Sequence, residues 1–255
     1  MPPGTPAKVP SDRERFLLEF CEIKNKITEH VLSNYEKPEN YSFLLSLTKM
    51  LHDMRYQKLN VDLENIKEDM DNYKTRQFFK KAQTIEPFIS YDISGTKTGR
   101  LTTKKDSFPI LTLDKSFRKI LKPKNDYFVE LDFNAAELRT LLALAGEQQP
   151  NGDIHDWNAK NVYKGLVTRE EAKKRIFAWL YNPSSKDFLS SCAYKRDEVV
   201  QKYYSDGQVK TFFDRIIPSD NHHALNYIIQ STTSDLFLRQ AIKVHEALKN
   251  TKSKI

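Results

Sequence analysis

The strongest constraint on how this chain folds is a run of side chains spaced by four residues. Arg169, Lys173, Phe177 and Tyr181 follow one another at this interval. On an α-helix each is rotated by ~40° from the last, so all four share one face. Two cations followed by two aromatic rings suit the phosphates, the base and the sugar of a nucleotide. An ordinary amphipathic helix with a basic and an apolar half explains the same spacing, and both interpretations stay open.

The limits and the opposite face of this helix are also visible in the sequence. Thr168 and Glu171 have the pattern of a capping box, which begins a helix, and Asn182-Pro183 ends it. The apolar face of the amphipathic interpretation would consist of Ile176, Trp179 and Leu180.

A second segment places a carboxylate at the end of an apolar run. Residues 127–132 are typical of a short, largely buried strand that ends in Asp132. Asn134 to Glu137 has the form of a capping box, and a helix of strong formers follows and stops at Gly146. A carboxylate on a rigid strand end suits a hard divalent cation. Asp132 can equally serve only to end the strand or cap the helix, and the cap alone accounts for Glu137.

A third segment lies on a long helix expected to run from Asp220 to about Lys249. His222, Asn226 and Gln230 are four residues apart and share one face of it. Amide and imidazole groups on one face can hydrogen-bond to bases or sugars in a groove. A solvated polar face explains the pattern as well.

The other parts of the chain predict packing elements. Residues 1–11 are rich in proline and are expected to be disordered, whereas residues 12–81 show helical spacing of apolar residues. Residues 194–204 are expected to form one further helix, broken by Gly207. The apolar stripes of the N-terminal region are Phe16, Leu17, Phe20, Ile23 and Ile27, and then Phe43, Leu44, Leu47 and Leu51.

Charge and composition narrow the classes of partner. The chain of 255 residues has a net charge of +7 and a pI near 9.1, which favours polyanionic partners and nucleic acid above all. Because many basic proteins bind no nucleic acid, this matters only together with the motifs. No apolar run approaches the ~20 residues that span a membrane, and no secretory signal is visible. With Cys21 and Cys192 as reduced thiols, we expect a soluble intracellular protein without a membrane partner, in a bacterium or an infected host cell.

The order of these segments resembles that of the family A DNA polymerases, the type of the bacterial repair polymerases and phage replicases. The run DFNAAELR from Asp132 to Arg139 is similar to the family's motif A, usually DYSQIELR. The RxxxKxxxFxxxY pattern that starts at Arg169 matches its motif B position for position. Further matches keep the same order over about residues 91–240: Thr98-Gly99-Arg100-Leu101, Asp153-Ile154-His155, and Asn226 and Gln230 with Asp235.

The resemblance implies a fold. We expect an α+β, predominantly helical chain with a right-hand polymerase architecture: a partial palm with a small antiparallel sheet, reduced fingers and a helical, thumb-like N-terminal region. The expected boundaries are a disordered lead-in at 1–11, a thumb-like region at 12–90, the first part of the palm with motif A at 91–150, fingers with the motif B helix at 151–210, and the second part of the palm at 211–255.

The resemblance also implies template-directed DNA synthesis. Two Mg²⁺ ions would serve the transfer of a deoxynucleotidyl group from a dNTP to a primer 3′-hydroxyl. Asp132 and the backbone carbonyl of Phe133 would bind these ions. The nucleotide contacts would be Arg169 and Lys173 at the triphosphate, with Lys173 as proton donor to pyrophosphate, His155 at the β-phosphate, Phe177 at the deoxyribose and Tyr181 near the nascent base pair.

Glu137 would close the space beside the 2′ carbon and exclude ribonucleotides. This distinguishes the chain from the single-subunit RNA polymerases, which share the architecture but have a small residue at that place. Primer–template DNA is the other expected partner, and its contacts would be Thr98, Arg100, His222, Asn226 and Gln230, mostly independent of base sequence.

The sequence departs from the family at one essential place. The family's motif C is an H-D pair on a hairpin after the last long helix, and His245-Glu246 lies inside the helical pattern instead. We therefore expect a truncated polymerase, or one split over two chains with motif C on a second polypeptide. The alternative is a non-catalytic, primer–template-binding remnant, and a basic helical scaffold is a third interpretation. A smaller departure is Asp214, which takes the place of a glycine in a T-x-x-G-R loop.

Overall fold

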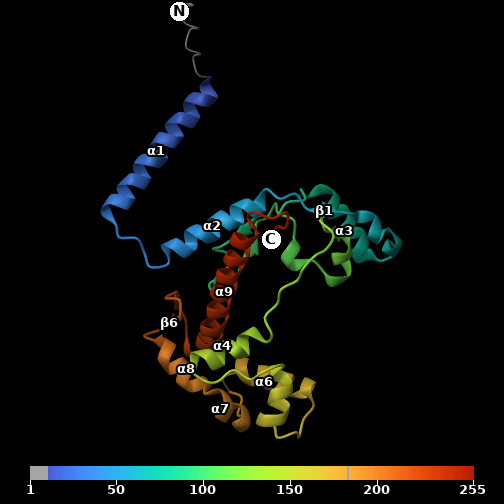
Figure 1. The fold of residues 1–255 in the computed structure, drawn as a ribbon, viewed down its shortest axis with the longest axis vertical. Helices are drawn as coiled ribbons and strands as arrows, with labels where there is room; N and C mark the ends of the chain where they lie inside the picture. Colours follow the sequence, from blue (N-terminus) through green and yellow to red (C-terminus); the bar gives the residue numbers. More distant parts are fainter. Residues whose placement is uncertain (1–10, 183) are drawn as a thin grey trace, which may run out of the picture. The chain divides into compact units, whose positions relative to one another are not determined.

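The computed structural model describes residues 11–182 and 184–255, and the chain divides into two compact units, 1–42 and 43–255. In the described part of the first unit lies the helix α1 (Asp12–Asn34; Figure 1). It begins with a complete capping box between Ser11 and Glu14. The predicted helix is therefore confirmed, but no residue of α1 is buried, so its apolar stripe forms no core. Of the lead-in predicted to be disordered, all but Ser11 lies outside the described residues.

The first half of the second unit combines short helices with two small antiparallel strand pairs. In α2 the predicted stripe is confirmed, because Phe43, Leu47 and Leu51 are buried in a cluster with Leu238. Strand β1 pairs with β4, and β2 pairs with β3. The elements are α2 (Tyr41–Arg55), β1 (Asn60–Val61), a 3-10 helix (Leu63–Asp69), α3 (Tyr73–Thr84), β2 (Tyr91–Asp92), β3 (Thr102–Thr103), two more 3-10 helices (Ile110–Thr112 and Lys115–Ile120) and β4 (Leu121–Lys122).

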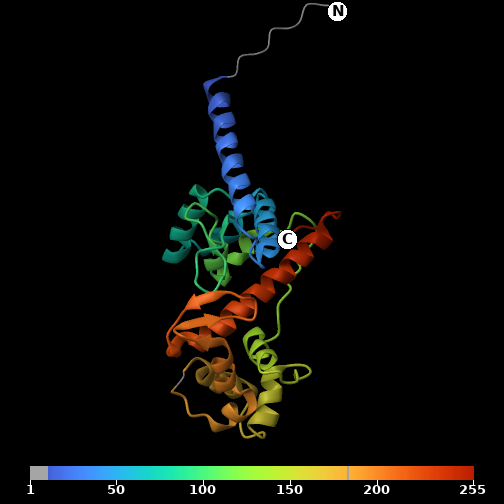
Figure 2. The same cartoon turned by 90° about the vertical axis from the view of Figure 1, so that its left-hand side faces the viewer.

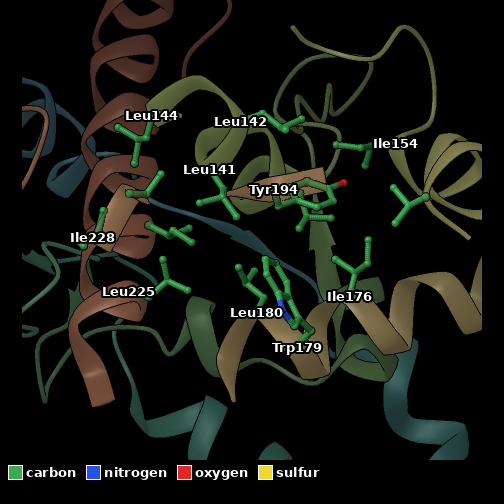
Figure 3. Close-up of a cluster of buried hydrophobic side chains, with 14 of the residues drawn as sticks. Leu141, Leu142, Leu144, Ile154, Ile176, Trp179, Leu180, Tyr194, Leu225 and Ile228 are labelled. Carbon is green, nitrogen blue, oxygen red and sulfur yellow. The ribbon is translucent and has the colours of Figure 1, made fainter. Parts of the chain in front are cut away.

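The second half contains the main hydrophobic core. It lies between α4, α6 and α9, whose side chains Leu141, Ile176 and Ile228 meet there (Figure 3). A three-stranded antiparallel sheet in the order β5-β6-β7 contacts α9 (Figure 2). The elements are α4 (Ala136–Leu144), α5 (Ile154–Trp157), a π-helix (Asn158–Val162), α6 (Arg169–Tyr181), α7 (Phe188–Tyr194), α8 (Arg196–Tyr203), β5 (Tyr204–Ser205), β6 (Gln208–Lys210), β7 (Ile216–Pro218) and α9 (Asn221–Leu248).

The predominance of helices with small antiparallel sheets agrees with the predicted fold class. The long C-terminal helix is confirmed, with Asp220 as its N-cap. The helix predicted over 194–204 is confirmed as α8, and Lys195 in the left-handed conformation (φ 46°) separates it from α7, which ends at Tyr194. Among the described residues, no helix combines the length and apolarity needed to cross a bilayer.

Helix α6 has the boundaries and the buried face that were predicted. Thr168 and Glu171 form both bonds of the capping box, and the helix ends at Tyr181. On its buried face, the indole N–H of Trp179 donates to Ser191 Oγ at 3.0 Å. Removing such a buried ring costs ~3–5 kcal/mol, so packing fixes the orientation of the opposite face.

The strand predicted at residues 127–132 is wrong. Residues 127–133 have no regular secondary structure and form no backbone–backbone hydrogen bond with any described residue. Their apolar side chains are exposed, with Tyr127 at 83% and Val129 at 81%. A strand exists only within a ladder, and no strand of the described chain lies alongside this one. The apolar pattern suits a buried strand, but the partner that would bury it is missing from these residues.

The capping box predicted at Asn134 to Glu137 is also wrong. Helix α4 does run to Leu144, and Gly146 adopts φ 73°, as expected for a helix end. However, its N-cap is Ala135 in the left-handed conformation (φ 47°), without a side-chain cap. The carboxylate of Glu137 instead bonds to side chains from distant parts of the chain.

Candidate nucleotide-binding site

The exposed face of α6 carries the four residues spaced by four. Phe177 and Tyr181 stack with ring centroids 6.1 Å apart and an interplanar angle of 18°. Lys173 is exposed one turn before Phe177, and Arg169 precedes it at the N-terminal end. Because the opposite face is held by the core, these side chains form a fixed stripe that changes from cationic to aromatic.

The carboxylate of Glu137 joins this stripe to two other parts of the chain. Its Oε1 accepts from Arg100 Nη2 at 3.1 Å, and its Oε2 accepts from the hydroxyl of Tyr181. Burial raises the pKa of Tyr181, and the bond to Glu137 raises it further, so the phenol is a neutral donor at physiological pH. Gln230 of α9 also hydrogen-bonds to Tyr181. Side chains from α4, from the loop of Arg100 and from α6 therefore meet at one carboxylate, and α9 contacts the group through Tyr181.

His155 extends the aromatic part of the site. Its ring lies 5.8 Å from that of Phe177, and the residue is buried. Burial lowers the pKa of His155, and the cations Lys173 and Arg169 lower it further against the opposing effect of Asp153, so the imidazole is neutral at pH 7. Its Nδ1 is buried without a partner among the described residues. Such a group is rare in a folded protein and indicates that something polar is missing beside it.

Arg169 is held by Asp153 at the entrance to α5. Its Nη2 lies 2.7 Å from Asp153 Oδ2, and it also pairs with Glu170. The other oxygen of Asp153 caps α5 by accepting from the backbone of His155 and Asp156. The hydrogen bond from Arg169 is the main reason that the pKa of Asp153 falls to about 2.

A pair of substitutions at Asp153 separates these two roles. Asp153→Asn keeps a capping oxygen and loses the ion pair, so we expect a loss of about 1–2 kcal/mol of stability at pH 7 because the pair is partly exposed. Asp153→Ala should lose about 1 kcal/mol more with the cap. A depressed carboxyl pKa stabilises above the unfolded value of 3.8 and this contribution fades as the pH falls toward 2. In urea unfolding, the difference in free energy of unfolding between the wild-type chain and Asp153→Asn should therefore become smaller from pH 7 to pH 3. A difference that does not change with pH would contradict the ion-pair role.

Asp132 and Phe133 lie on the exposed segment that precedes α4. Asp132 is exposed and its Oδ1 accepts from the N–H of Phe133 at 2.9 Å, while the Phe133 ring meets Phe237 of α9 edge-on at 6.5 Å. Within the described part of the chain, no hydrogen bond, ion pair or ring contact joins this pair to the α6 stripe. Among residues 11–182 and 184–255, no group of three or more His, Cys, Asp or Glu side chains is arranged to hold a metal. One carboxylate does not by itself fit a site for two hard cations.

The residues predicted to contact DNA are placed unevenly. Arg100 has a half-exposed side chain at Glu137, and Gln230 reaches Tyr181, whereas Thr98 is buried. His222 and Asn226 line a hollow of about 300 Å³ that Tyr181 also lines. The Oδ1 of Asn226 is buried without a partner in the described part of the chain.

The sequence does not reveal the ion pair between Arg215 and Asp235, whose guanidinium also lies against Gly99. We call these three residues the clamp. Arg215 binds the buried Asp235 through two bonds, Nη2 to Oδ1 at 2.7 Å and Nε to Oδ2 at 3.3 Å. The guanidinium also lies against Gly99, where a Cβ would come within 2.5 Å of Arg215 Nη2, and Gly99 has φ +74°. Asp214 adopts φ 61°, so it keeps the turn conformation that favours glycine. The clamp thus ties the loop that carries Arg100 to α9.

The fold that holds this site is similar to that of a solved DNA polymerase domain. Over 90% of this chain and 63% of the other, it is similar to the polymerase domain of Pol1 from M. smegmatis in complex with DNA primer-template and dNTP, with a TM-score of 0.57 and 14% sequence identity.

The sequence comparison points to the same class of protein. Over 160 residues the chain is 27% identical to a DNA polymerase of Mycobacterium phage L5. This stretch is 51% of the present chain and 26% of the phage protein, so the chain corresponds to a part of that relative. No protein-family model matches the chain.

Proposed function

We propose that this chain carries the nucleotide-binding and primer–template-binding part of a family A DNA polymerase. The observation that supports it best is the convergence on Glu137, which bonds to Arg100 and to Tyr181, with Phe177 stacked on Tyr181. These residues come from the three segments that resemble the family's motifs, and no property of an amphipathic helix requires them to meet. The similarity to a phage DNA polymerase and the polymerase-domain fold support the same conclusion.

In this proposal the α6 stripe binds a deoxynucleoside triphosphate. Lys173 and Arg169 would contact the phosphates through charge-assisted hydrogen bonds, and Arg169 would exchange part of its bonding to Asp153 for the ligand. Lys173 would donate a proton to the leaving pyrophosphate. The neutral His155 would donate to a β-phosphate oxygen through a ring N–H, and the buried unpaired atoms of His155 and Asn226 support a polar ligand nearby.

The remaining assignments follow the right-hand arrangement. Residues 12–90 would be thumb-like, 91–150 and 211–255 would be palm, and 151–210 would be reduced fingers. Arg100, Gln230, Asn226 and His222, with the backbone around the buried Thr98, would contact primer–template. We place the protein inside a bacterium or an infected host cell.

The proposal includes two Mg²⁺ ions, and it requires a second carboxylate ligand besides Asp132. Asp132 and the Phe133 carbonyl would hold two Mg²⁺ ions, which would supply activation of the primer 3′-hydroxyl and neutralisation of pyrophosphate. Since one carboxylate does not fit both ions, a second must come from residues other than those described. The unpaired backbone of 127–131 is where we expect an added strand to bring it, from downstream sequence or from a second polypeptide.

Primer extension tests the proposal directly. The chain alone and the chain supplied with the downstream reading frame, or with the second polypeptide, would be compared on a primed template with Mg²⁺ and dNTPs. We expect template-directed extension only in the completed form. A completed form that binds primer–template but never extends it would overturn the assignment as a polymerase.

A non-catalytic remnant is the second candidate. The absence of a metal-holding cluster among the described residues favours it. Such a remnant would bind primer–template and stay inactive after completion. Binding alone does not distinguish the two candidates, because both predict binding that weakens with salt.

Substitutions at Glu137 test the proposed discrimination between sugars. Glu137→Ala opens space beside the 2′ carbon, so the ratio of ribonucleotide to deoxynucleotide incorporation should rise by roughly tenfold or more. Glu137→Gln keeps the volume and loses the charge, so it should keep the discrimination even if the rate falls. The ratio of kcat/KM values for the two nucleotides is the measurement. An unchanged ratio in Glu137→Ala would place the gate elsewhere.

A further inference from the structure

A cleft outside the nucleotide site is built from three parts of the second unit. It has a volume of about 800 Å³ and lies where the end of α2, the β1–β4 pair and the C-terminal end of α9 come together. Asn125 Nδ2 donates to the carbonyl of Lys252 at 3.1 Å, and His245 Nε2 lies 3.1 Å from Asp53 Oδ2. The walls are therefore tied to one another, and the cleft shares no lining residue with the α6 stripe.

The lining of this cleft is strongly cationic. Its only carboxylate side chain is Asp53, which faces His245. Lys249 pairs with Glu246, but the other five lysines have no carboxylate partner among the described residues. Ammonium groups that converge on a concavity raise the local potential and attract polyanions. The six lysines are Lys58, Lys122, Lys124, Lys249, Lys252 and Lys254.

Two tyrosines on different walls add exposed aromatic rings to the cleft. Tyr56 follows α2 and is 65% exposed, and Tyr127 follows β4 and is 83% exposed. The ring of His52 meets that of Tyr56 in a T-shaped contact with centroids 4.9 Å apart, and Tyr56 stays 65% exposed beside it. Exposed aromatic rings among cations suit unpaired bases on a phosphate backbone, because in a duplex the base faces are already stacked on each other.

We propose that this lysine cleft binds single-stranded nucleic acid. The lysines would contact successive phosphates, and Tyr56 and Tyr127 would stack on bases. The cleft shares no residue with the α6 stripe and overlaps the proposed polymerase site only at Tyr127, so the lysine variants test it without changing the nucleotide-binding residues. In a polymerase it would hold an unpaired part of the substrate away from the nucleotide-binding face.

Binding of fluorescein-labelled oligo(dT) to the whole chain, followed by anisotropy at several salt concentrations, tests the proposal. The double variant Lys122→Glu/Lys252→Glu should weaken binding by at least tenfold and reduce the salt slope by about 1.4, from two lost phosphate contacts at ~0.7 each. The matched control is Lys80→Glu/Lys81→Glu, which makes the same change in net charge on exposed residues of α3. Equal losses in both double variants would show an effect of net charge alone and overturn the site.

Variants of the tyrosines test whether bases are contacted. Tyr56→Ala should weaken oligo(dT) binding about tenfold, whereas Tyr56→Phe should keep it because the ring remains. A duplex of the same length or a poly-glutamate peptide whose binding falls as much as that of oligo(dT) in Lys122→Glu/Lys252→Glu would overturn the proposal in favour of a general polyanion site. Unchanged oligo(dT) binding in the Tyr56→Ala/Tyr127→Ala variant would do the same. None of these residues belongs to the α6 stripe, so an inactive polymerase site leaves these outcomes unaffected.

Discussion

Replacing Asp132 with asparagine should lower primer extension by about a thousandfold or more in the completed form of the protein. Asparagine has the shape of aspartate but no charge, and a hard cation depends on anionic oxygen ligands. A factor of a thousand corresponds to ~4 kcal/mol of transition-state stabilisation. The fold should not suffer, because Asp132 is exposed and its bond to the Phe133 N–H can be made by an amide oxygen. Single-turnover extension with saturating dNTP is the measurement.

Two nearby carboxylates give matched controls for this variant. Asp126 and Glu130 are exposed on the same segment and form no ion pair with any residue that the structure describes. Asp126→Asn and Glu130→Gln should therefore leave extension within about twofold, and all three variants should bind primer–template alike. Extension by Asp132→Asn at more than a tenth of the wild-type rate would remove Asp132 from the metal site.

Replacing Asp235 with alanine should destabilise the second unit by about 2–4 kcal/mol. The substitution leaves Arg215 without its carboxylate, and breaking a buried pair on one side costs ~3–5 kcal/mol. The expected loss is somewhat smaller because the Arg215 side chain is 30% exposed and reaches water. Both tryptophans, Trp157 and Trp179, lie in this unit, so tryptophan fluorescence in urea reports on it directly.

The double variant Asp235→Ala/Arg215→Ala provides the sharper comparison. Because it removes both charges, it should be less destabilised than Asp235→Ala alone. Glu246→Ala, which breaks an exposed pair with Lys249 on the same helix, should cost less than 0.5 kcal/mol by the usual weakness of surface pairs. If Asp235→Ala loses no more free energy of unfolding than this control, the clamp does not stabilise the fold.

Loss of the clamp should also disturb the position of Arg100 at the proposed nucleotide site. Arg215 lies against Gly99, so releasing it frees the loop that positions Arg100 at Glu137. We therefore expect Asp235→Ala, at a temperature where it is still folded, to bind primer–template more weakly than Glu246→Ala does.

The parts of the site that the sequence predicts are those fixed by local geometry. A spacing of four residues, a capping box at Thr168 and a helix end at Tyr181 depend only on neighbours along the chain, and α6 has all three. The grouping of Glu137 with Arg100 and Tyr181 joins residues 37 and 44 positions away. No local pattern encodes such a contact: the resemblance to a family assigned Glu137 and Tyr181 to the nucleotide and Arg100 to primer–template DNA, without joining them.

The wrong predictions have the same physical origin. Residues 127–132 have the composition of a buried strand, but a strand needs a partner that is absent from the described chain. Asn134 has the right chemistry for a cap, but Ala135 takes a left-handed turn and Glu137 is drawn to a distant arginine and tyrosine. The lysine cleft was not predicted because its lysines are scattered from position 58 to 254 and only the fold brings them together.

The hydrogen bond between Tyr181 and Glu137 has an evolutionary consequence. It joins a side chain proposed to sense the base pair to one proposed to sense the sugar, so neither position is free to vary alone. A substitution at either residue changes the anchoring of the other, and the effects of the two should not add. Lineages that alter sugar preference through one of these residues are expected to carry a compensating change at the other.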